Sequence, residues 1–271
     1  MFKKIKQWFN KSKTKPIPIV SYKDEQNKKT VDIKTRQSGN LELKRVSYKE
    51  NGDHYFIIKK NNTVLSLSIE ARTLLKRYPE IFKIVNGLLF NKSIENIETS
   101  KLKFNISKLN LPSNSSRNNV GVYKLTFLDK ETNLRKEYFI KLGKKYDSGN
   151  YPSYNEFESQ KILEAAGFNI IKPHFAIWGE NVTNPKYKFN NIIVYDFTNL
   201  TNYEYALDNK LLSKEEINAI NKKRSKANEF AQNNLGITDI STKGNIFYER
   251  LPSGEIKIYF TDSAKIWNGK I

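Results

Sequence analysis

The sequence predicts an α+β fold with a largely antiparallel sheet. Short runs of β-forming residues alternate with turn residues, a pattern typical of strands joined as hairpins. Other windows carry apolar residues close to a 3.6-residue period, which predicts helices. Hydrophobic residues make up 38% of the 271 positions and fall in these periodic runs, so the chain is expected to bury a core. Its length suits one large or two modest domains.

The composition limits the chemistry. The chain contains no cysteine, which excludes disulfides, thiolate catalysis and cysteine-based zinc or iron–sulfur sites. Its only histidines, His54 and His174, lie far apart, so neither a histidine metal cluster nor a Ser-His-Asp triad is expected. The formal charge of +19 indicates an anionic partner such as nucleic acid, a membrane surface or nucleotide phosphates. The alternative is a bias toward Lys, Asn and Ile that is spread over the whole chain.

Residues 1–16 hold six lysines and no acidic residue. Phe2, Ile5, Trp8 and Phe9 recur at helical spacing, so this segment is either a basic amphipathic helix in peripheral contact with a membrane or a solvated tail. The sequence has no transmembrane segment, because no apolar run approaches the roughly 18 residues that span a bilayer. It also lacks a signal-peptide pattern. We therefore expect a cytoplasmic protein, or one exported into a host cell without a classical signal peptide.

Residues 17–100 are predicted to form a small α+β module without visible chemistry. Its polar, lysine-rich start indicates edge strands or loops, and Pro79 is expected to kink or divide the helix that follows. A domain junction is placed near residues 93–107, where the pattern thins. The predicted elements of the module are a hairpin with strands at 55–58 and 64–67 and a helix over 69–90.

Residues 101–271 begin with a succession of strands. The polar loop 112–119, which includes Ser115 and Ser116, is suited to wrapping a phosphate, and Gly121 stands at its exit. An ordinary hairpin loop is the alternative. Lys141 ends a strand, where a lysine is typically a surface residue. The predicted elements are strands at 104–109, 120–128, 138–142, 175–178 and 191–197, a helix over 153–166 and a linker over 198–202.

The C-terminal part carries a capping box and a hairpin. Ser213 and Glu216 have the spacing that opens a helix, and Gly236 ends it. The runs 245–250 and 255–260 then flank turn residues centred on Ser253. Paired residues in this hairpin have numbers that add up to about 506. This register places Tyr248 opposite Ile258, Asn245 opposite Thr261, and Asp262 beside Gly244.

Three oxygen-bearing side chains are expected at the open end of this hairpin. Asn245 and Asp262 lie there through the register, and Asp239 enters from the preceding loop. Two carboxylates and one carboxamide suit Mg²⁺, which prefers oxygen ligands. The alternative is that Asp and Asn stand at strand ends because they favour turns.

In this order the elements resemble the protein-kinase-like superfamily, and most closely its bacterial branch of HipA-type toxin kinases and small kinase-like effectors. The residues that carry the resemblance lie between about 102 and 267. They are Val120–Leu125, Phe139-Ile140-Lys141, Asn155-Glu156-Phe157, and the series Asp239, Asn245 and Asp262. The fold implied is protein-kinase-like, with an antiparallel N-lobe sheet in residues 101–271.

The resemblance implies an ATP-dependent phosphotransferase that uses Mg²⁺ and phosphorylates Ser or Thr of a protein, autophosphorylation included. The sequence does not identify this protein substrate. The roles implied are Lys141 on the α- and β-phosphates with Glu156 as its partner, Asp239 as catalytic base, Lys243 as a neutralising charge, Asn245 and Asp262 as metal ligands, and Ser115, Ser116 and Gly121 at the phosphates.

The chain also departs from the family pattern. Five residues, 240–244, separate Asp239 from Asn245, where the family has four. Ser263-Ala264 follow Asp262 in place of Phe-Gly, and Ile237 stands where many kinases have histidine. Only nine residues follow Asp262, so a truncated, mostly helical C-lobe is expected. The alternative function is therefore a catalytically inactive pseudokinase, or a basic module that binds nucleic acid or an acidic partner.

Overall fold

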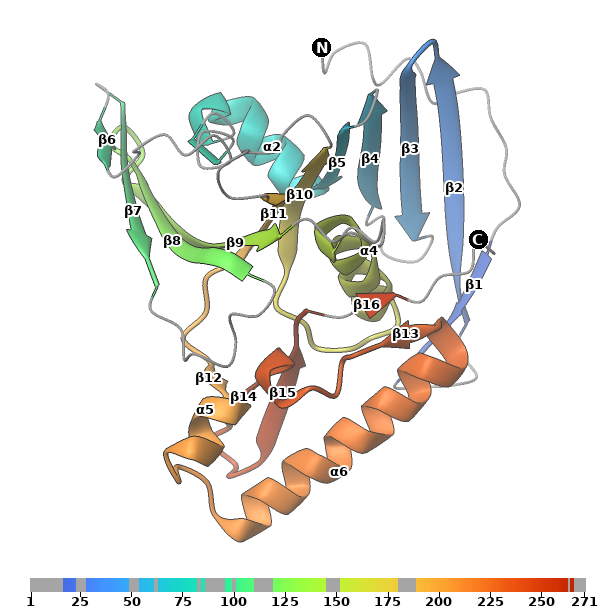
Figure 1. Cartoon of the computed structure of the whole chain (residues 1–271), viewed down its shortest axis with the longest axis vertical. Helices are drawn as coiled ribbons and strands as arrows, with labels where there is room; N and C mark the ends of the chain where they lie inside the picture. The colour runs from blue at the N-terminus through green and yellow to red at the C-terminus, as the bar shows by residue number, and fades with distance from the viewer. Residues whose placement is uncertain are drawn as a thin grey trace.

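The computed structural model confirms an α+β fold dominated by one antiparallel sheet (Figure 1). Two short accessory sheets and a few helices complete it. The predicted basic segment 1–16 lies outside the described residues. The structure describes residues 17–22, 28–48, 54–60, 63–81, 84–85, 96–98, 101–109, 119–144, 152–179, 189–262 and 264–265.

Eleven strands form the main sheet in the order β1-β2-β3-β4-β5-β10-β11-β9-β8-β7-β6. Every neighbouring pair is antiparallel, as hairpin-rich sequence predicts. The strands are β1 (Ile17–Val20), β2 (Lys28–Ser38), β3 (Leu41–Tyr48), β4 (His54–Lys60), β5 (Thr63–Ser68), β6 (Asn96–Glu98), β7 (Leu102–Lys108), β8 (Asn119–Asp129), β9 (Leu134–Lys144), β10 (Pro173–Gly179) and β11 (Phe189–Asp196).

The sheet runs across the predicted domain junction. β5 belongs to the N-terminal module and β10 to the region beyond the junction, yet they pair from Leu67 opposite Phe175 to Thr63 opposite Gly179. The residues of β10 from 173 to 178 are buried, as in a strand covered on both faces. The strands predicted as edge strands or loops in residues 19–51 are β1, β2 and β3, and they extend the same sheet.

Two helices follow strands of this sheet. α2 (Ile69–Arg77) begins at Ser68, whose hydroxyl accepts a hydrogen bond from the Ala71 amide. It ends before Tyr78 and Pro79, so the predicted helix over 69–90 is divided at the proline, and of the residues from the proline to 90, 79–81 and 84–85 are described and are helical. α4 (Pro152–Ala165) agrees with the predicted helix over 153–166.

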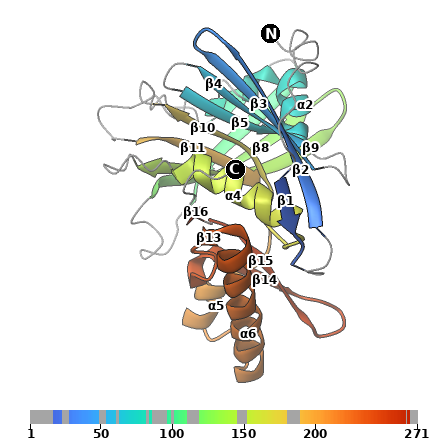
Figure 2. The same cartoon turned by 90° about the vertical axis from the view of Figure 1, so that its right-hand side faces the viewer.

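The C-terminal part lies below the sheet in Figures 1 and 2. The capping box at Ser213 and Glu216 is confirmed, and Gly236 ends the helical region with a φ of 61°. The predicted linker over 198–202 ends in a short strand. The elements are β12 (Thr201–Asn202), α5 (Tyr203–Asp208), α6 (Lys214–Phe230), a π-helical turn (Ala231–Leu235), β13 (Ile237–Thr238), a 3-10 turn (Lys243–Asn245), β14 (Ile246–Arg250), β15 (Ile256–Phe260) and β16 (Ala264–Lys265).

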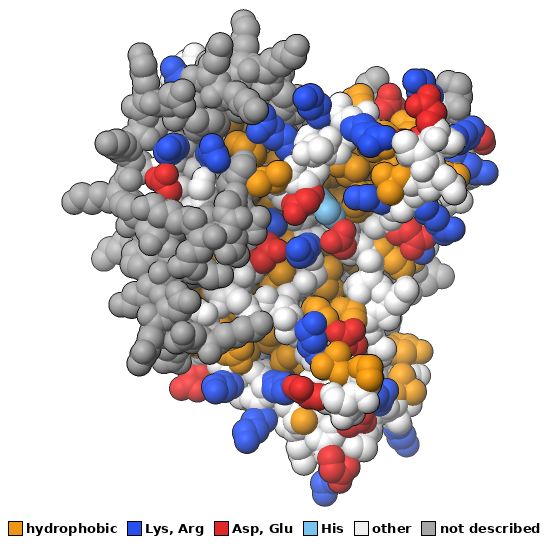
Figure 3. All heavy atoms as spheres, turned by 180° about the vertical axis from the view of Figure 1, so that it is seen from behind, with side chains coloured by type: hydrophobic (Ala, Val, Ile, Leu, Met, Phe, Trp, Pro, Cys, Tyr) orange, Lys and Arg blue, Asp and Glu red, His pale blue; other side chains and the backbone are white. Residues whose placement is uncertain are grey.

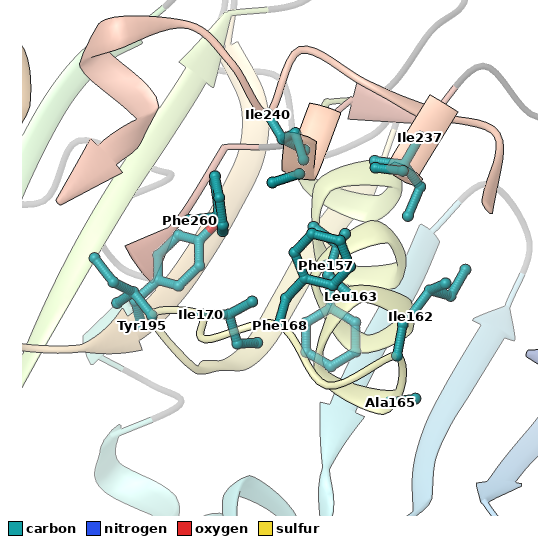
Figure 4. Packing of buried hydrophobic residues seen from close by; sticks show 14 of the residues in the cluster. Phe157, Ile162, Leu163, Ala165, Phe168, Ile170, Tyr195, Ile237, Ile240 and Phe260 are labelled. Carbon is teal, nitrogen blue, oxygen red and sulfur yellow. The ribbon is translucent and has the colours of Figure 1, made fainter. Parts of the chain in front are cut away.

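Two hydrophobic cores lie on the two faces of the sheet. One contains α2 and side chains such as Phe56, Phe127 and Phe175. The other contains α4 and joins the sheet to the C-terminal part, with Phe157 packed near Phe260 in Figure 4. Because this second core includes residues of β2 to β5 as well as of α6 and β14, one continuous apolar cluster connects the N-terminal strands to the C-terminal hairpin.

α4 is buried on nearly all sides. Between positions 156 and 166, only Glu158 and Glu164 are more than slightly exposed. Tyr55 of β4 contacts Phe157 with an edge-to-face geometry and a centroid distance of 5.8 Å. Tyr22, just after β1, donates its backbone N–H to the Ala166 carbonyl at 2.7 Å. The N-terminal strands therefore contact the same helix that packs on β10 and β11.

No helix among the described residues is long and apolar enough to cross a membrane.

Candidate functional site

Lys141 lies at the centre of the candidate site. It is in β9, directly opposite Val122 of β8 and Ile193 of β11, so its backbone is fixed by hydrogen-bonded strands on both sides. Its Nζ lies 3.1 Å from Oε2 of Glu156 and 2.5 Å from Oδ2 of Asp262. Only 12% of the lysine side chain is exposed. One buried ammonium therefore contacts two carboxylates from distant parts of the chain.

Glu156 reaches Lys141 from the first half of α4. Its side chain is 3% exposed, and its Oε1 accepts a hydrogen bond from the Tyr195 hydroxyl. Burial raises the pKa of Glu156 to about 8, the charge of Asp262 adds to this, and Lys141 opposes it. The ion pair with Lys141 that the sequence predicts for this residue is present.

The charges of the other two groups stabilise one another. Burial alone would lower the pKa of Lys141, but the attraction of Asp262 and Glu156 outweighs burial and raises it. Burial would raise the pKa of Asp262, but the lysine charge outweighs burial and lowers it. Asp262 keeps 43% of its side chain exposed, so its carboxylate is the accessible one of the two. Two acidic side chains share one lysine, and Asp262 is the one of them that could also meet a second cation.

The hairpin places Asp262 as its register predicts. Tyr248 pairs with Ile258, and the Thr261 amide donates to the Asn245 carbonyl at 2.9 Å. The side-chain amide of Asn245 donates to the carbonyls of Asp239 at 2.9 Å and of Asp262 at 2.8 Å. Asn245 thus ties the two aspartate segments together, and its Oδ1 is the side-chain atom left to meet a cation.

Both aspartates have a left-handed backbone, with φ of 66° at Asp239 and 50° at Asp262. Aspartate tolerates this conformation better than most residues. The segments on either side of them are joined by the β13–β16 ladder, in which Ile237 faces Lys265 and Thr238 faces Ala264. This ladder holds the loop of Asp262 against the loop of Asp239.

The loop of Asp239 is anchored to α4 by apolar contacts. Ile237 and Ile240 are fully buried and belong to the same core as Phe157, as Figure 4 shows. The Asp239 side chain between them is exposed. The helix that carries Glu156 and the loop that carries Asp239 therefore share one packed contact.

The other predicted site residues are Asp239, Lys243, Gly121, Ser115 and Ser116. The exposed Asp239 carboxylate accepts a hydrogen bond from the Thr242 hydroxyl, and Lys243, in the following turn, is also exposed. Gly121 is buried at a bulge in β8, one residue before Val122, which faces Lys141. Ser115 and Ser116 lie outside the described residues, so their predicted contact with phosphate stays a prediction.

Oxygen ligands and a fixed positive charge lie together in this cluster. Asp262 and Asn245 offer oxygen ligands, and Mg²⁺ is commonly held by one or two carboxylates together with substrate phosphates. Lys141 offers a fixed positive charge. In the described ranges, no three His, Asp or Glu side chains gather closely enough to bind a metal by themselves. A cation at Asp262 would thus depend on further ligands such as phosphate oxygens.

Sequence reasoning missed Tyr195 and the β13–β16 ladder. Tyr195 stands in the apolar run of β11 with only 2% of its surface exposed. A buried tyrosine hydroxyl requires a hydrogen-bond partner, and that requirement is the signal that marks this residue. The ladder joins segments of two residues each, which are too short to give a recognisable strand pattern.

The surface seen in Figure 3 mixes charges of both signs. Lys and Arg side chains on that face stand among Asp and Glu side chains. Several lysines of the chain form ion pairs, such as Lys172 with Glu164 at 3.6 Å. A histidine lies among acidic side chains there, which is where His174 contacts Asp196 at 2.5 Å. The described side chains on this face form no continuous basic stripe of the kind that nucleic-acid binding favours.

No family model, curated protein or solved structure matches this chain, which leaves its own side chains as the guide to function.

Proposed function

We propose that this protein is an ATP-dependent phosphotransferase of the protein-kinase-like type, which transfers the terminal phosphoryl group to a Ser or Thr hydroxyl of a protein. The observation that carries the proposal is the contact of Lys141 with both Glu156 and Asp262. A lysine held by one buried carboxylate and directed at a second, accessible one is the arrangement that the family resemblance implies for binding Mg²⁺ and the phosphates of ATP.

The order of the elements supports the same proposal. β7, β8, β9, β11 and β10 are consecutive neighbours in the sheet, and α4 connects β9 to β10. A linker at 197–200 then leads to α5, α6 and the β14–β15 hairpin, with Asp262 two residues after β15. This is the order in which the resemblance implies phosphate-covering strands, lysine strand, glutamate helix, linker and metal-binding loop.

In the proposed complex, Lys141 holds the nonreacting phosphates and Glu156 keeps the lysine in place. Asp262 and the Oδ1 of Asn245 are the ligands that would hold Mg²⁺, which supplies positive charge to the phosphate oxygens. Catalysis of this kind depends on positioning and on electrostatic stabilisation more than on covalent chemistry by the protein. The strand, helix and hairpin contacts described above fix these side chains before any ligand binds.

The proposed transfer assigns Asp239 as the base. Its exposed carboxylate accepts the proton of the acceptor hydroxyl, whose oxygen forms the new bond to the γ-phosphorus of ATP. The bond from that phosphorus to the bridging oxygen breaks, and ADP leaves with the electron pair. Lys243, exposed in the same loop, is placed to neutralise charge on the transferred group. Autophosphorylation is included, with a hydroxyl of this chain as the acceptor.

Nucleotide binding is the first test. Calorimetry should show ATP binding that requires Mg²⁺ and that is lost in Asp262→Asn and Lys141→Met. Lys161→Met is the matched control, because Lys161 is another buried lysine paired with a glutamate, with its Nζ 2.8 Å from Oε2 of Glu164. Binding that is absent in the wild type, or lost equally in all three variants, would contradict the proposal.

Phosphoryl transfer is the second test. Incubation with radiolabelled ATP should label the protein itself or an added protein acceptor, and Asp239→Asn should remove the label without removing nucleotide binding. The fold of each variant is checked by circular dichroism.

A pseudokinase is the second candidate, favoured by the contact of Asp239 with Thr242. In this contact the Asp239 carboxylate is engaged by its own loop instead of by an acceptor hydroxyl. Mg²⁺-dependent nucleotide binding with no label on any acceptor would select this candidate. Binding to nucleic acid that weakens steeply with salt, and that Lys141→Met and Asp262→Asn leave unchanged, would instead select the basic binding module.

A further inference from the structure

We infer that Tyr195 is a positioning residue, which fixes the Glu156 carboxylate in the orientation in which it meets Lys141. The two oxygens of this carboxylate have separate partners. Oε1 accepts a hydrogen bond from the Tyr195 hydroxyl, and Oε2 lies 3.1 Å from Nζ of Lys141. Each oxygen is thereby assigned, and the plane of the carboxylate is defined by two contacts at its two ends. The consequence for nucleotide binding rests on the proposed function.

Tyr195 is itself held rigidly. It lies in β11, between β9 and β10, and pairs across the strands with Phe139. Its ring packs in the same core as Phe260 and Ile170, beside which Figure 4 shows it. A tyrosine has only two side-chain torsions, and a central strand fixes its backbone. The position of the Tyr195 hydroxyl is therefore well defined. Glu156, which projects from α4, accepts the hydrogen bond of this hydroxyl.

We expect the Tyr195 hydroxyl to control how Lys141 divides its contacts between Glu156 and Asp262. Lys141 contacts Glu156 and Asp262, and the Glu156 carboxylate is 3% exposed, so water cannot readily replace a missing donor. Without the hydroxyl, Oε1 of Glu156 would be a buried acceptor without its donor, which is costly. The carboxylate would then turn so that both oxygens compete for the lysine. Lys141 would be drawn toward the helix and away from Asp262.

Tyr195→Phe is the informative variant, because it removes only the hydroxyl. The matched control is Tyr203→Phe. Tyr203 is also fully buried, and its hydroxyl donates to Oδ1 of Asn221 at 3.1 Å, in the C-terminal part. Both variants lose one buried tyrosine hydrogen bond, so a general loss of stability affects both. Only Tyr195→Phe alters a neighbour of Lys141.

The contact can be observed without nucleotide. A buried hydroxyl proton that is hydrogen-bonded to a carboxyl group and shielded from solvent exchange gives a resolved downfield proton resonance. We expect such a resonance in the wild type and in Tyr203→Phe, and its loss in Tyr195→Phe. It should move in Lys141→Met, because that change releases the other oxygen of Glu156. A resonance that does not respond to Lys141→Met would overturn the inference.

The effect on the site is measured with the Mg²⁺–ATP complex. Tyr195→Phe should weaken its binding about tenfold, the size expected for one hydrogen bond to a charged group, whereas Tyr203→Phe should not change it. In a Glu156→Gln background, Tyr195→Phe should have almost no further effect, because its action passes through the carboxylate. Equal effects of Tyr195→Phe in both backgrounds would overturn the inference.

The two proposals can fail separately. A wild type that binds no Mg²⁺–ATP removes the proposed function, and the response of the hydroxyl proton to Lys141→Met then decides the role of Tyr195. A wild type that binds the nucleotide with Tyr195→Phe and Tyr203→Phe indistinguishable removes the positioning role and leaves the proposed function standing.

Discussion

Lys141 and Asp262 are joined by a 2.5 Å contact between Nζ and Oδ2, although one lies in the middle of the main sheet and the other follows the last hairpin. This ion pair connects a strand of the main sheet to the C-terminal part. The Asn245 side chain donates a hydrogen bond to the Asp262 carbonyl, and Glu156 contacts Nζ of Lys141. The contribution of the Lys141–Asp262 contact to the stability of the fold can be measured separately from its contribution to ligand binding.

Lys141→Met should destabilise the fold by about 3–5 kcal/mol, because it leaves the carboxylate of Glu156 buried without its cation. The double variant Lys141→Met/Glu156→Gln should recover part of this loss, since it removes the unpaired charge together with its partner. Urea denaturation measures both values. A double variant less stable than Lys141→Met alone would mean that the pair itself contributes most of the stability.

Asn245→Asp should separate the scaffolding role of this residue from its role as a ligand. A carboxylate cannot donate to the carbonyls of Asp239 and Asp262, so the variant should lose about 1–3 kcal/mol of stability. It should also bind the Mg²⁺–ATP complex more weakly, although aspartate is the better Mg²⁺ ligand. Tighter binding than in the wild type would show that the two hydrogen bonds do not position the site.

Asp129 should give the protein a specific sensitivity to acid. The Tyr78 hydroxyl donates to Oδ2 of Asp129 at 2.5 Å, and this hydrogen bond is the main cause that lowers the pKa of Asp129 to about 2. A carboxyl with a lowered pKa in the folded state stabilises the fold above its ordinary pKa of 3.8, and this stabilisation is lost as the pH falls from there toward 2.

Melting temperatures between pH 5 and 2 measure this effect of Asp129. Asp129→Asn should be less stable than the wild type at pH 5, and the difference should shrink toward pH 2. Tyr78→Phe should move the acid transition to higher pH, because it removes the largest cause of the shift. A constant difference across the range would assign the acid sensitivity to other carboxylates.

Tyr22 should contribute to stability well beyond its own strand. Its ring stacks on Phe168 at a centroid distance of 4.2 Å and meets Phe230 edge-on at 5.3 Å. Tyr22→Ala should cost about 2 kcal/mol, below the range for fully buried aromatic residues because the ring is only partly buried. Tyr22→Phe should be nearly neutral. If urea denaturation shows similar losses for both variants, the hydroxyl and not the stacking is responsible.

Ser213 should show the value of the capping box of α6. Its hydroxyl accepts from the Glu216 amide at 3.2 Å, and the Glu216 carboxylate accepts from the Ser213 amide at 2.8 Å. Ser213→Ala should cost about 1 kcal/mol, whereas Ser213→Asp should retain most of the stability. Thermal unfolding measures both, and a harmless Ser213→Ala would mean that the Arg250–Glu216 ion pair at 2.6 Å holds this helix end alone.

The sequence was sufficient to predict features that depend on residues close together in the chain. The register of the β14–β15 hairpin follows from its turn at Ser253, and the start of α6 follows from Ser213 and Glu216. These features depend on turn geometry and on local hydrogen bonds, which a few adjacent residues determine. For the same reason Asn245 and Asp262 could be placed together in advance.

The pairing of β5 with β10 could not be predicted in this way. It joins two strands that no short turn connects, and its register is set by tertiary packing. The run from Phe175 to Trp178 indicated a strand, but not that β5 would be one of its neighbours. The role of Tyr195 was hidden for a similar reason, because its partner Glu156 lies on a helix that reaches it only in the folded molecule.

The enclosure of α4 has a mechanical consequence. Because β4, the segment after β1 and the loop of Ile237 all pack on this helix, moving Glu156 out of reach of Lys141 would require two contacts to open together, the ring contact of Tyr55 with Phe157 and the hydrogen bond of the Tyr22 amide to the Ala166 carbonyl. Such a helix is clamped rather than hinged. Control of this protein by swinging α4 would therefore demand partial unfolding, so any on–off regulation must act on access to the site instead of on its assembly.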